Sequence, residues 1–372
     1  MRRYPQTRAF TIVELLVVVS IIALLVGILL PAIGKARDNA QLTRSQANLR
    51  NLGAAAQTYA AEYGDRQFSL IDDNFGRYGS DVTEASQNFP GGHPISVLGW
   101  GYGGQWWYWT SSVAANRTRM PIDFSTKFGA FRMLNMRAFN TFVNGRFYDE
   151  VFYAPKDTAA VSTVLKYQEL PHEFAPPEDL GLPASTPIPW SSYCFSPAAM
   201  YNPAVFSRQA DGTYFKDPFA FDAGFRSPSM SQATYSNLKT HIIEHHWLQG
   251  RRKECNPAFT NGTYDGCEPY YFNHSRDSKP VCLFYDGHID IIGYQTAEAH
   301  NYRVYQQNGQ TIGLWNNQVQ GNGYNLTSPY PTPGDPLMST GGYWHEQSYD
   351  WAVSSFHILT TDGIKGRDIL AN

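Results

Sequence analysis

One apolar segment near the N-terminus constrains this chain more than any other feature. Residues 10–33 read "FTIVELLVVVSIIALLVGILLPAI", and Glu14 is the single charged residue among them. As an α-helix, these about 24 residues would extend ~36 Å, enough to cross the hydrocarbon core of a bilayer. A charge at that depth costs at least ~2.5 kcal/mol. Glu14 therefore needs a functional explanation.

Positive charge is concentrated in front of this segment. Arg2, Arg3 and Arg8 precede it, and no acidic residue stands before Glu14. A basic head before an apolar segment stays on the cytoplasmic side of a membrane, so the rest of the chain faces the periplasm or the exterior. The whole chain has a net charge of −3, and nothing in this balance indicates a nucleic-acid partner.

Two common explanations of the segment leave Glu14 unexplained. A secretory signal peptide has an acid-free core and a small-residue cleavage site after it, and neither feature is present here. A plain membrane anchor accounts for the length of the segment but not for the carboxylate.

The pattern "AFTIVELL", followed by an apolar helix with Pro31 in its second half, resembles the class III signal of type IV pilins and type II secretion pseudopilins. The resemblance implies that a prepilin peptidase cuts between Ala9 and Phe10 on the cytoplasmic side and methylates the new amine. Residues 1–9 are then a leader peptide. Ala9 departs from the family pattern, in which glycine usually precedes the cut.

The resemblance also gives Glu14 a role in assembly. Cleavage creates a positive amine at Phe10, at the start of a helix whose dipole is already positive there. In a filament, Glu14 of one subunit can pair with the Phe10 amine of another and fix the axial register. Misregistered assembly is disfavoured because an unpaired buried charge costs several kcal/mol. The simpler alternative is an acid that is tolerated near the cytoplasmic face.

The helix is expected to continue beyond the apolar segment. Residues 10–33 form its transmembrane and polymerisation half, and residues 34–64 form an amphipathic half that packs on a body. Gly64 ends the pattern as a C-cap. Pro31 lacks an N–H and crowds the preceding turn, which predicts a kink or a locally melted stretch over residues 24–31. The apolar stripe of the second half consists of Leu42, Leu49, Leu52, Ala56, Tyr59 and Tyr63.

Residues 65–372 read as a globular β-rich domain with long loops, in which residues 72–146 form a possible insertion. Aromatic residues make up 15% of the chain, which excludes a disordered body. The stretch "VCLFYDGHIDIIG" places Asp286 and Gly287 between two alternating apolar runs, a strong hairpin signal. The expected fold is α+β, with one long N-terminal helix packed on a mainly antiparallel β-sheet body.

Asp286, Gly287 and the upstream His274 resemble the C-terminal His–Asp-Gly signature of planctomycete-type prepilin-like proteins. "VFYAPKD" at 151–157 and "LKTHIIEHH" at 238–246 resemble strand segments of that family. His274 and Asp286 could also supply two members of a catalytic triad, but no activated nucleophile accompanies them. A structural role beside the hairpin turn is therefore favoured.

The four cysteines suit an oxidising compartment. Cys255 and Cys267 bracket an eleven-residue loop rich in turn residues, which a disulfide would staple. Cys194 and Cys282 would form the remaining pair. Four free buried thiols are the alternative, and the absence of a C-x-x-C pair argues against a zinc ribbon.

The sequence "HIIEH" at 241–245 matches the H-x-x-E-H pattern of inverted zinc proteases. That chemistry requires a helix, which places both histidines on one face. The β-branched residues between them favour a strand, with His241 on the face opposite Ile242 and Glu244. The sequence therefore argues against a metalloprotease.

Two further features bear on ligand binding. Four tryptophans lie within residues 99–112, and burial together in the core is the favoured interpretation; an exposed cluster could instead bind carbohydrate or mediate adhesion. The loop carboxylates Asp335, Asp350 and Asp362 are candidate calcium ligands without EF-hand spacing. Calcium therefore stays unresolved, and no other cofactor is expected.

These observations predict a structural subunit of a type IV pilus-like filament or a type II secretion pseudopilus, not an enzyme. Its partners would be copies of itself or other pilins, the prepilin peptidase, and an assembly platform in the inner membrane. It would cross that membrane once before assembly, with its body periplasmic or extracellular. The competing hypothesis is a membrane-anchored surface protein that binds carbohydrate or acts as a zinc hydrolase.

Overall fold

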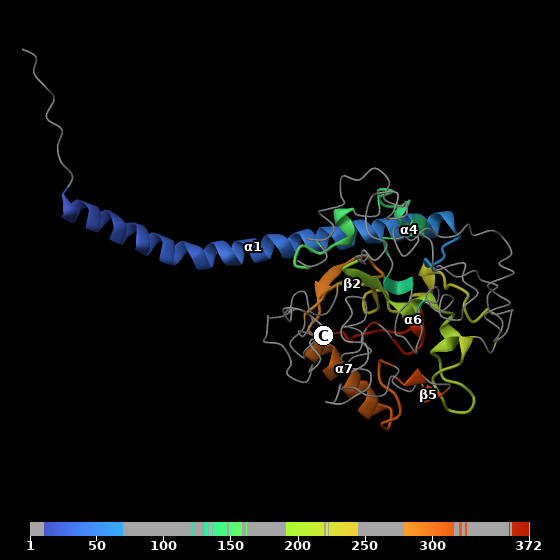
Figure 1. Ribbon diagram of the computed structural model, residues 1–372. Helices are drawn as coiled ribbons and strands as arrows, with labels where there is room; N and C mark the ends of the chain where they lie inside the picture. The colour runs from blue at the N-terminus through green and yellow to red at the C-terminus, as the bar shows by residue number, and fades with distance from the viewer. Residues whose placement is uncertain are drawn as a thin grey trace, which may run out of the picture.

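The computed structural model describes residues 11–69, 121, 130–132, 134–135, 137–146, 149–157, 161, 191–218, 221, 223–244, 279–315, 320–321, 324–325, 357 and 359–371. They form one long helix, α1, and a body with a four-stranded antiparallel sheet (Figure 1). This is the α+β architecture that the sequence predicts.

Helix α1 spans Ile12–Glu62, and local contacts hold both of its ends. At its start, Thr11 and Glu14 form a capping box, which satisfies two backbone N–H groups. At its end, Gly64 adopts the left-handed conformation with φ +66°. The N–H of Asp65 donates to a carbonyl of the last turn at 2.6 Å, as in a Schellman motif. The prediction of one long helix that Gly64 ends is confirmed.

The two halves of α1 have different surroundings. The first half projects from the body, whereas the second half crosses it (Figure 1). Tyr63, predicted on the apolar stripe, is 47% exposed and stacks on Tyr59 with ring centroids 4.4 Å apart. The buried residues of α1 all belong to the second half: Ser45, Asn48, Leu49, Leu52, Ala55, Ala56 and Ala60.

Helix α1 continues through Pro31 without interruption. Local melting over residues 24–31, one of the two predicted effects of this proline, is therefore not what the structure shows. The helix axis instead changes direction within the exposed half (Figure 1). A proline in a helix interior produces such a bend because it removes one hydrogen bond and crowds the preceding turn.

The sheet has the strand order β1-β2-β3-β4 and is antiparallel throughout. Every residue of β1, β2 and β3 is buried, whereas β4 is partly exposed. Helix α1 packs against the sheet, with β2 directly below it in Figure 1. The strands span Tyr193–Phe195 (β1), Thr240–Glu244 (β2), Val281–Phe284 (β3) and Ile289–Ile291 (β4).

The β3–β4 hairpin forms where Asp286 and Gly287 predict it. Its loop has three residues, because the N–H of Phe284 donates to the carbonyl of His288 at 3.0 Å. Gly287 has φ +88°, which a glycine adopts without steric cost. The loop is thus a turn followed by a left-handed residue, the three-residue form common in hairpins.

Close packing joins α1 to the sheet. A Cβ atom on Gly53 would lie 2.7 Å from Cδ2 of Leu283, so the missing side chain allows α1 to approach β3. Beside this contact, the rings of Phe68, Phe139 and Phe195 pack with centroids 5.1, 5.2 and 5.8 Å apart. These rings join the segment after α1 to β1 and form part of the core.

Short elements complete the described part of the body. Residues 151–157, predicted as a strand segment, begin instead within the 3₁₀ helix η3, whose N-cap Asp149 accepts a hydrogen bond from the N–H of Val151 at 2.9 Å. The remaining elements are η2 (Ala130–Arg132), α4 (Arg137–Asn140), η3 (Glu150–Phe152), α6 (Pro197–Met200), η5 (Pro203–Val205), η7 (Met230–Gln232), α7 (Tyr294–Gln307), β5 (Gln320–Gly321), β6 (Tyr324–Asn325) and η9 (Gly363–Lys365).

Candidate assembly site and the polar networks of the body

The carboxylate of Glu14 lies at the free end of α1 and is held by its own helix terminus. Its Oε2 accepts hydrogen bonds from the backbone N–H of Thr11 at 2.9 Å and from the Thr11 hydroxyl at 2.8 Å. The same hydroxyl accepts from the backbone N–H of Glu14 at 3.2 Å. Ala9 and Phe10 lie outside the described residues. The capping box thus orients the acid toward the helix start, where cleavage would place a new amine.

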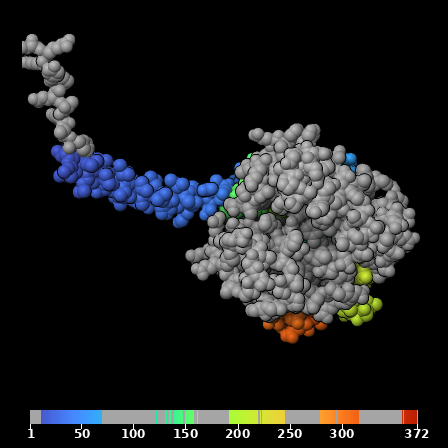
Figure 2. All heavy atoms as spheres, in the orientation of Figure 1, coloured from blue at the N-terminus to red at the C-terminus, as the bar shows by residue number. Residues whose placement is uncertain are grey.

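Large apolar side chains surround the helix axis after this capping box. The exposed fraction is 85% for Ile12 at the start of the segment and 60% for Ile33 at its end, and it is still 45% for Val18 and Val26. The hydroxyl of Ser20 donates to a carbonyl of the preceding turn at 2.8 Å, so this polar group is satisfied inside the helix. Figure 2 shows the segment standing clear of the body.

Such a surface requires an apolar environment. Soluble monomers rarely expose continuous apolar patches of this size, and lipid or neighbouring helices would supply the missing contacts. By length and composition, α1 is the one helix among the described residues that could cross a membrane. The apolar half of α1 is therefore compatible with membrane anchoring and with helix packing in an assembly.

The same residues match a known family model. Residues 5–30 match the prokaryotic N-terminal methylation motif, which includes Glu14 and most of the apolar segment. The chain therefore carries a prepilin-type signal of the kind found in type IV pilins and pseudopilins. This signal indicates a pilin-like or pseudopilin role in general terms, with processing by prepilin peptidase. No curated protein and no solved structure matches the chain.

The H-x-x-E-H sequence lies on a strand, β2, and its second histidine is outside the described residues. The side chain of His241 stacks on Tyr285 with ring centroids 4.5 Å apart, whereas Oε1 of Glu244 accepts a hydrogen bond from Ser45 of α1 at 2.7 Å. Among the described residues, no three His, Cys, Asp or Glu side chains are grouped as metal ligands. The helical geometry that this zinc chemistry needs is not formed by β2.

The predicted alternation of β2 is wrong at His241. The register shifts between Thr240 and Ile242, as at a β-bulge. The ring of His241 packs against Phe195, with centroids 5.6 Å apart, and Phe195 pairs with Ile242 across the sheet. Because paired residues share a face, His241 lies on the face it was expected to oppose.

A buried ion pair joins the start of β2 to the C-terminal segment, and no sequence signal predicts it. Nζ of Lys239 lies 2.8 Å from Oδ2 of Asp368, and both side chains are 0% exposed. Lys239 also donates to the hydroxyls of Ser196 and Thr360, each at 2.8 Å. All three ammonium protons therefore have partners.

Asp368 is enclosed by donors. Its Oδ2 accepts from the backbone N–H of Thr240 at 3.0 Å and from the Thr240 hydroxyl at 2.5 Å, and its Oδ1 accepts from Thr360 at 2.5 Å. Burial alone would raise the pKa of Asp368, but the charge of Lys239 and these hydrogen bonds lower it overall. The network thus holds a carboxylate in its charged form inside the body.

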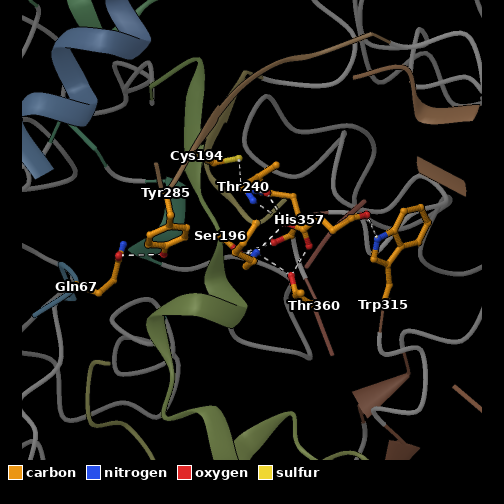
Figure 3. A network of polar contacts seen from close by, with 10 residues as sticks. Gln67, Cys194, Ser196, Thr240, Tyr285, Trp315, His357 and Thr360 are labelled. Carbon is orange, nitrogen blue, oxygen red and sulfur yellow. Dashed lines mark hydrogen bonds and ion pairs between the residues drawn. The ribbon is translucent and has the colours of Figure 1, made fainter. Parts of the chain in front are cut away.

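His357 extends this network toward β1 (Figure 3). Its Nδ1 lies 2.6 Å from the Thr240 hydroxyl. Because that hydroxyl gives its single proton to Asp368, Nδ1 of His357 must be the donor. The backbone carbonyl of His357 accepts from the Ser196 hydroxyl at 2.6 Å. Cys194 lies near the other ring nitrogen, with Sγ 3.9 Å from Nε2.

A second polar network joins α1 to the opposite face of the sheet. Ser45 donates to Glu244, and its Oγ lies 2.9 Å from the hydroxyl of Tyr193. That hydroxyl also accepts from the amide of Asn48 at 3.3 Å. Each group thus donates to the next: the Asn48 amide to the Tyr193 hydroxyl, that hydroxyl to Ser45, and Ser45 to the Glu244 carboxylate. Burial, reinforced by the Glu244 charge, raises the pKa of Tyr193, so its hydroxyl keeps the proton that this chain requires.

The predicted bond between Cys194 and Cys282 is wrong. Both cysteines are free and buried, and both pair with Ile243, one from each side of β2. Adjacent strands lie about 4.8 Å apart, so two strand spacings separate the cysteines by more than the ~7 Å limit between disulfide-linked Cα atoms. Cys255 and Cys267 lie outside the described residues.

The remaining predicted residues have mixed outcomes. Asp286 accepts from the backbone N–H of His288 at 3.1 Å and lies 2.5 Å from its Nδ1, so it is bonded within the hairpin turn. His274, the tryptophan cluster, Asp335 and Asp350 lie outside the described residues. Asp362 is the N-cap residue of η9, in the left-handed conformation. The described part of the chain thus gives Asp286 and Asp362 local structural roles.

Proposed function

We propose that this chain is a structural subunit of a type IV pilus-like filament or a type II secretion pseudopilus, and that it has no catalytic role. A prepilin peptidase cuts between Ala9 and Phe10 on the cytoplasmic side of the inner membrane. The processed subunit leaves the membrane through an assembly platform and joins other copies or other pilins through the apolar half of α1. The body then lies in the periplasm or outside the cell.

One observation carries this proposal. The segment that matches the methylation motif is also the segment that stands clear of the body as an exposed apolar helix, with Glu14 at its start. A secretory leader would be removed with its apolar core, whereas a cut after Ala9 retains the whole helix. A mature helix of this kind can pack against other copies.

The proposal also assigns a partner to Glu14. In the isolated chain, Thr11 supplies the hydrogen bonds to the carboxylate, and these contacts leave its charge without a cationic partner within the capping box. The Phe10 amine of a neighbouring subunit would supply that partner. This pairing would fix the axial register of the filament, because each step along the filament axis must align one Glu14 carboxylate with one Phe10 amine.

The first experiment is the intact mass and N-terminal sequence of the protein isolated from its native cells. A chain that begins with N-methylated Phe10 is the expected result. A chain that retains residues 1–9 would contradict the proposal, because Glu14 would then have no new amine to meet. A membrane-anchored protein would become the better explanation.

A second experiment tests assembly. Glu14→Ala should abolish filaments, as seen by electron microscopy and by sedimentation of sheared material, while the variant is still inserted and cut. Ser20→Ala is the matched control, since it removes a polar group of the same segment that donates to a carbonyl of its own helix. Filaments of normal number from Glu14→Ala would exclude the proposed pairing.

A further inference from the structure

A groove on the body is lined by cations that have no role in the proposed filament assembly. Its volume is 570 Å³, and it lies between the segment that follows α1, the region of η5 and the 3₁₀ helix η9. Arg66, Arg226 and Lys365 line it, and the eleven lining residues that the structure describes include no acidic and no aromatic side chain. The segment after α1, the segment before η7 and η9 thus each bring one cation to this concavity.

Backbone pairing fixes one wall of the groove. Arg66 forms an isolated antiparallel bridge with Ser229, and the N–H of Gln67 donates to the carbonyl of Pro228 at 2.8 Å. Nη1 of Arg66 donates to the carbonyl of Ser227 at 2.6 Å. The first cation is therefore held in place before any ligand arrives.

The lining also supplies neutral polar groups. Asn202, Ser207 and Gln232 line the groove together with Lys365. Asn202 is oriented by two bonds, since its Oδ1 accepts from the N–H of Ala204 at 3.0 Å and its Nδ2 donates to a carbonyl at 3.1 Å. Amide and hydroxyl groups in such positions suit a ligand that carries hydroxyls as well as charge.

The acid next to Arg66 in the sequence has hydrogen-bond partners of its own. Asp65 precedes Arg66, but its carboxylate accepts from the N–H of Ser231 at 3.2 Å and from its hydroxyl at 2.5 Å. Asp65 does not belong to the lining residues. The described lining residues thus contribute three cations and no acid to the groove, although the whole chain has a net charge of −3.

We propose that this groove binds an acidic saccharide through its carboxylate or sulfate groups. Guanidinium groups recognise oxyanions by paired hydrogen bonds, and the two arginines with Lys365 line the groove with three cations. The volume lies in the range of about 300–1,000 Å³ that is usual for small-molecule sites. Neutral sugars and nucleobases commonly stack on aromatic rings, and the described lining residues include none.

This proposal is independent of filament assembly, and its test uses the full-length chain in detergent at low salt. Titration calorimetry with a digalacturonate and with a sulfated disaccharide should show saturable binding of at least one of them. Inorganic phosphate and a neutral disaccharide are the comparison ligands, and neither should bind as tightly.

The double variant Arg226→Ala/Lys365→Ala should weaken saccharide binding by about tenfold or more. Arg66 is left unchanged, because it also supports the chain after α1. Arg303→Ala on α7 is the matched control, since it removes an exposed cation outside the groove, and it should leave affinity unchanged. No saccharide binding, tighter binding of inorganic phosphate alone, or equal affinity in the double variant would overturn the proposal.

Discussion

At the scale of single residues, the body keeps titratable groups in defined states by burial and hydrogen bonding. Nε2 of His241 lies 3.3 Å from the side-chain nitrogen of Gln67, which can only donate. The histidine must therefore accept at Nε2 and is neutral. Burial lowers its pKa to about 3, and the nearby charge of Lys239 adds to this effect.

This neutral histidine predicts a loss of stability in acid. The unfolded chain binds a proton at this residue below about pH 6.5, whereas the folded chain resists protonation down to a pKa of about 3. The stability that neutral His241 contributes is fully present above pH 6.5. The free energy of unfolding then falls by up to ~1.4 kcal/mol per pH unit as the pH drops toward 3.

Urea unfolding of the full chain between pH 7 and 4 measures this effect. His241→Gln should be less stable than the natural chain at pH 7, and the difference should shrink as the pH falls. The natural chain, measured in the same series, provides the reference slope. An unchanged slope in His241→Gln would show that this histidine does not govern acid stability.

The ion pair of Lys239 and Asp368 makes a second prediction at this scale. Lys239→Met leaves a buried carboxylate without its cation and should reduce the free energy of unfolding by about 3–5 kcal/mol. Lys279→Met removes an exposed lysine and should change it by less than ~0.5 kcal/mol.

A double-mutant cycle separates the pair from the rest of the network. Lys239→Met and Asp368→Leu together should cost less than the sum of the two single changes, because neither partner is left charged and alone. Denaturant unfolding monitored by far-UV circular dichroism provides all four values. Additive losses would show that the two charges do not stabilise one another.

At the scale of elements, the sequence predicts what depends on local pattern. Helix α1 and its end follow from the spacing of apolar residues and from Gly64, and the β3–β4 hairpin follows from Asp286 and Gly287. The Lys239–Asp368 contact could not be predicted in this way, because 129 positions separate the partners. The bulge at His241 was also missed, since it depends on how β2 meets β3 rather than on its own residues.

The sheet register makes its own prediction for the cysteines. Cys194 and Cys282 lie on either side of Ile243, and burial raises the pKa of the Cys282 thiol. Both should resist alkylation in the folded chain and react fully in urea without any reductant. Peptide mapping by mass spectrometry checks this result. A peptide pair linked through these two cysteines would contradict the register.

At the scale of the whole molecule, the chain combines two parts with separate requirements. The apolar half of α1 is exposed along its length and carries the methylation motif. The other half is a core helix of the body, fixed by Ser45, Asn48 and the close approach at Gly53. One continuous helix therefore joins a segment that needs lipid or other helices to a domain with its own core.

This division predicts that assembly and body stability respond to different substitutions. Glu14→Ala should abolish filaments but change the unfolding free energy of the body by less than ~0.5 kcal/mol, because among the described residues Glu14 bonds only to Thr11 at the free end of α1. Ser45→Ala should destabilise the body by about 1–3 kcal/mol, since it removes a donor to the buried Glu244. It should leave processing at Ala9 unchanged.

Urea unfolding in detergent, N-terminal sequencing and electron microscopy of both variants provide the comparison. A large loss of body stability in Glu14→Ala would mean that the two halves of α1 are coupled, since the end of the helix would then support a core that it does not touch.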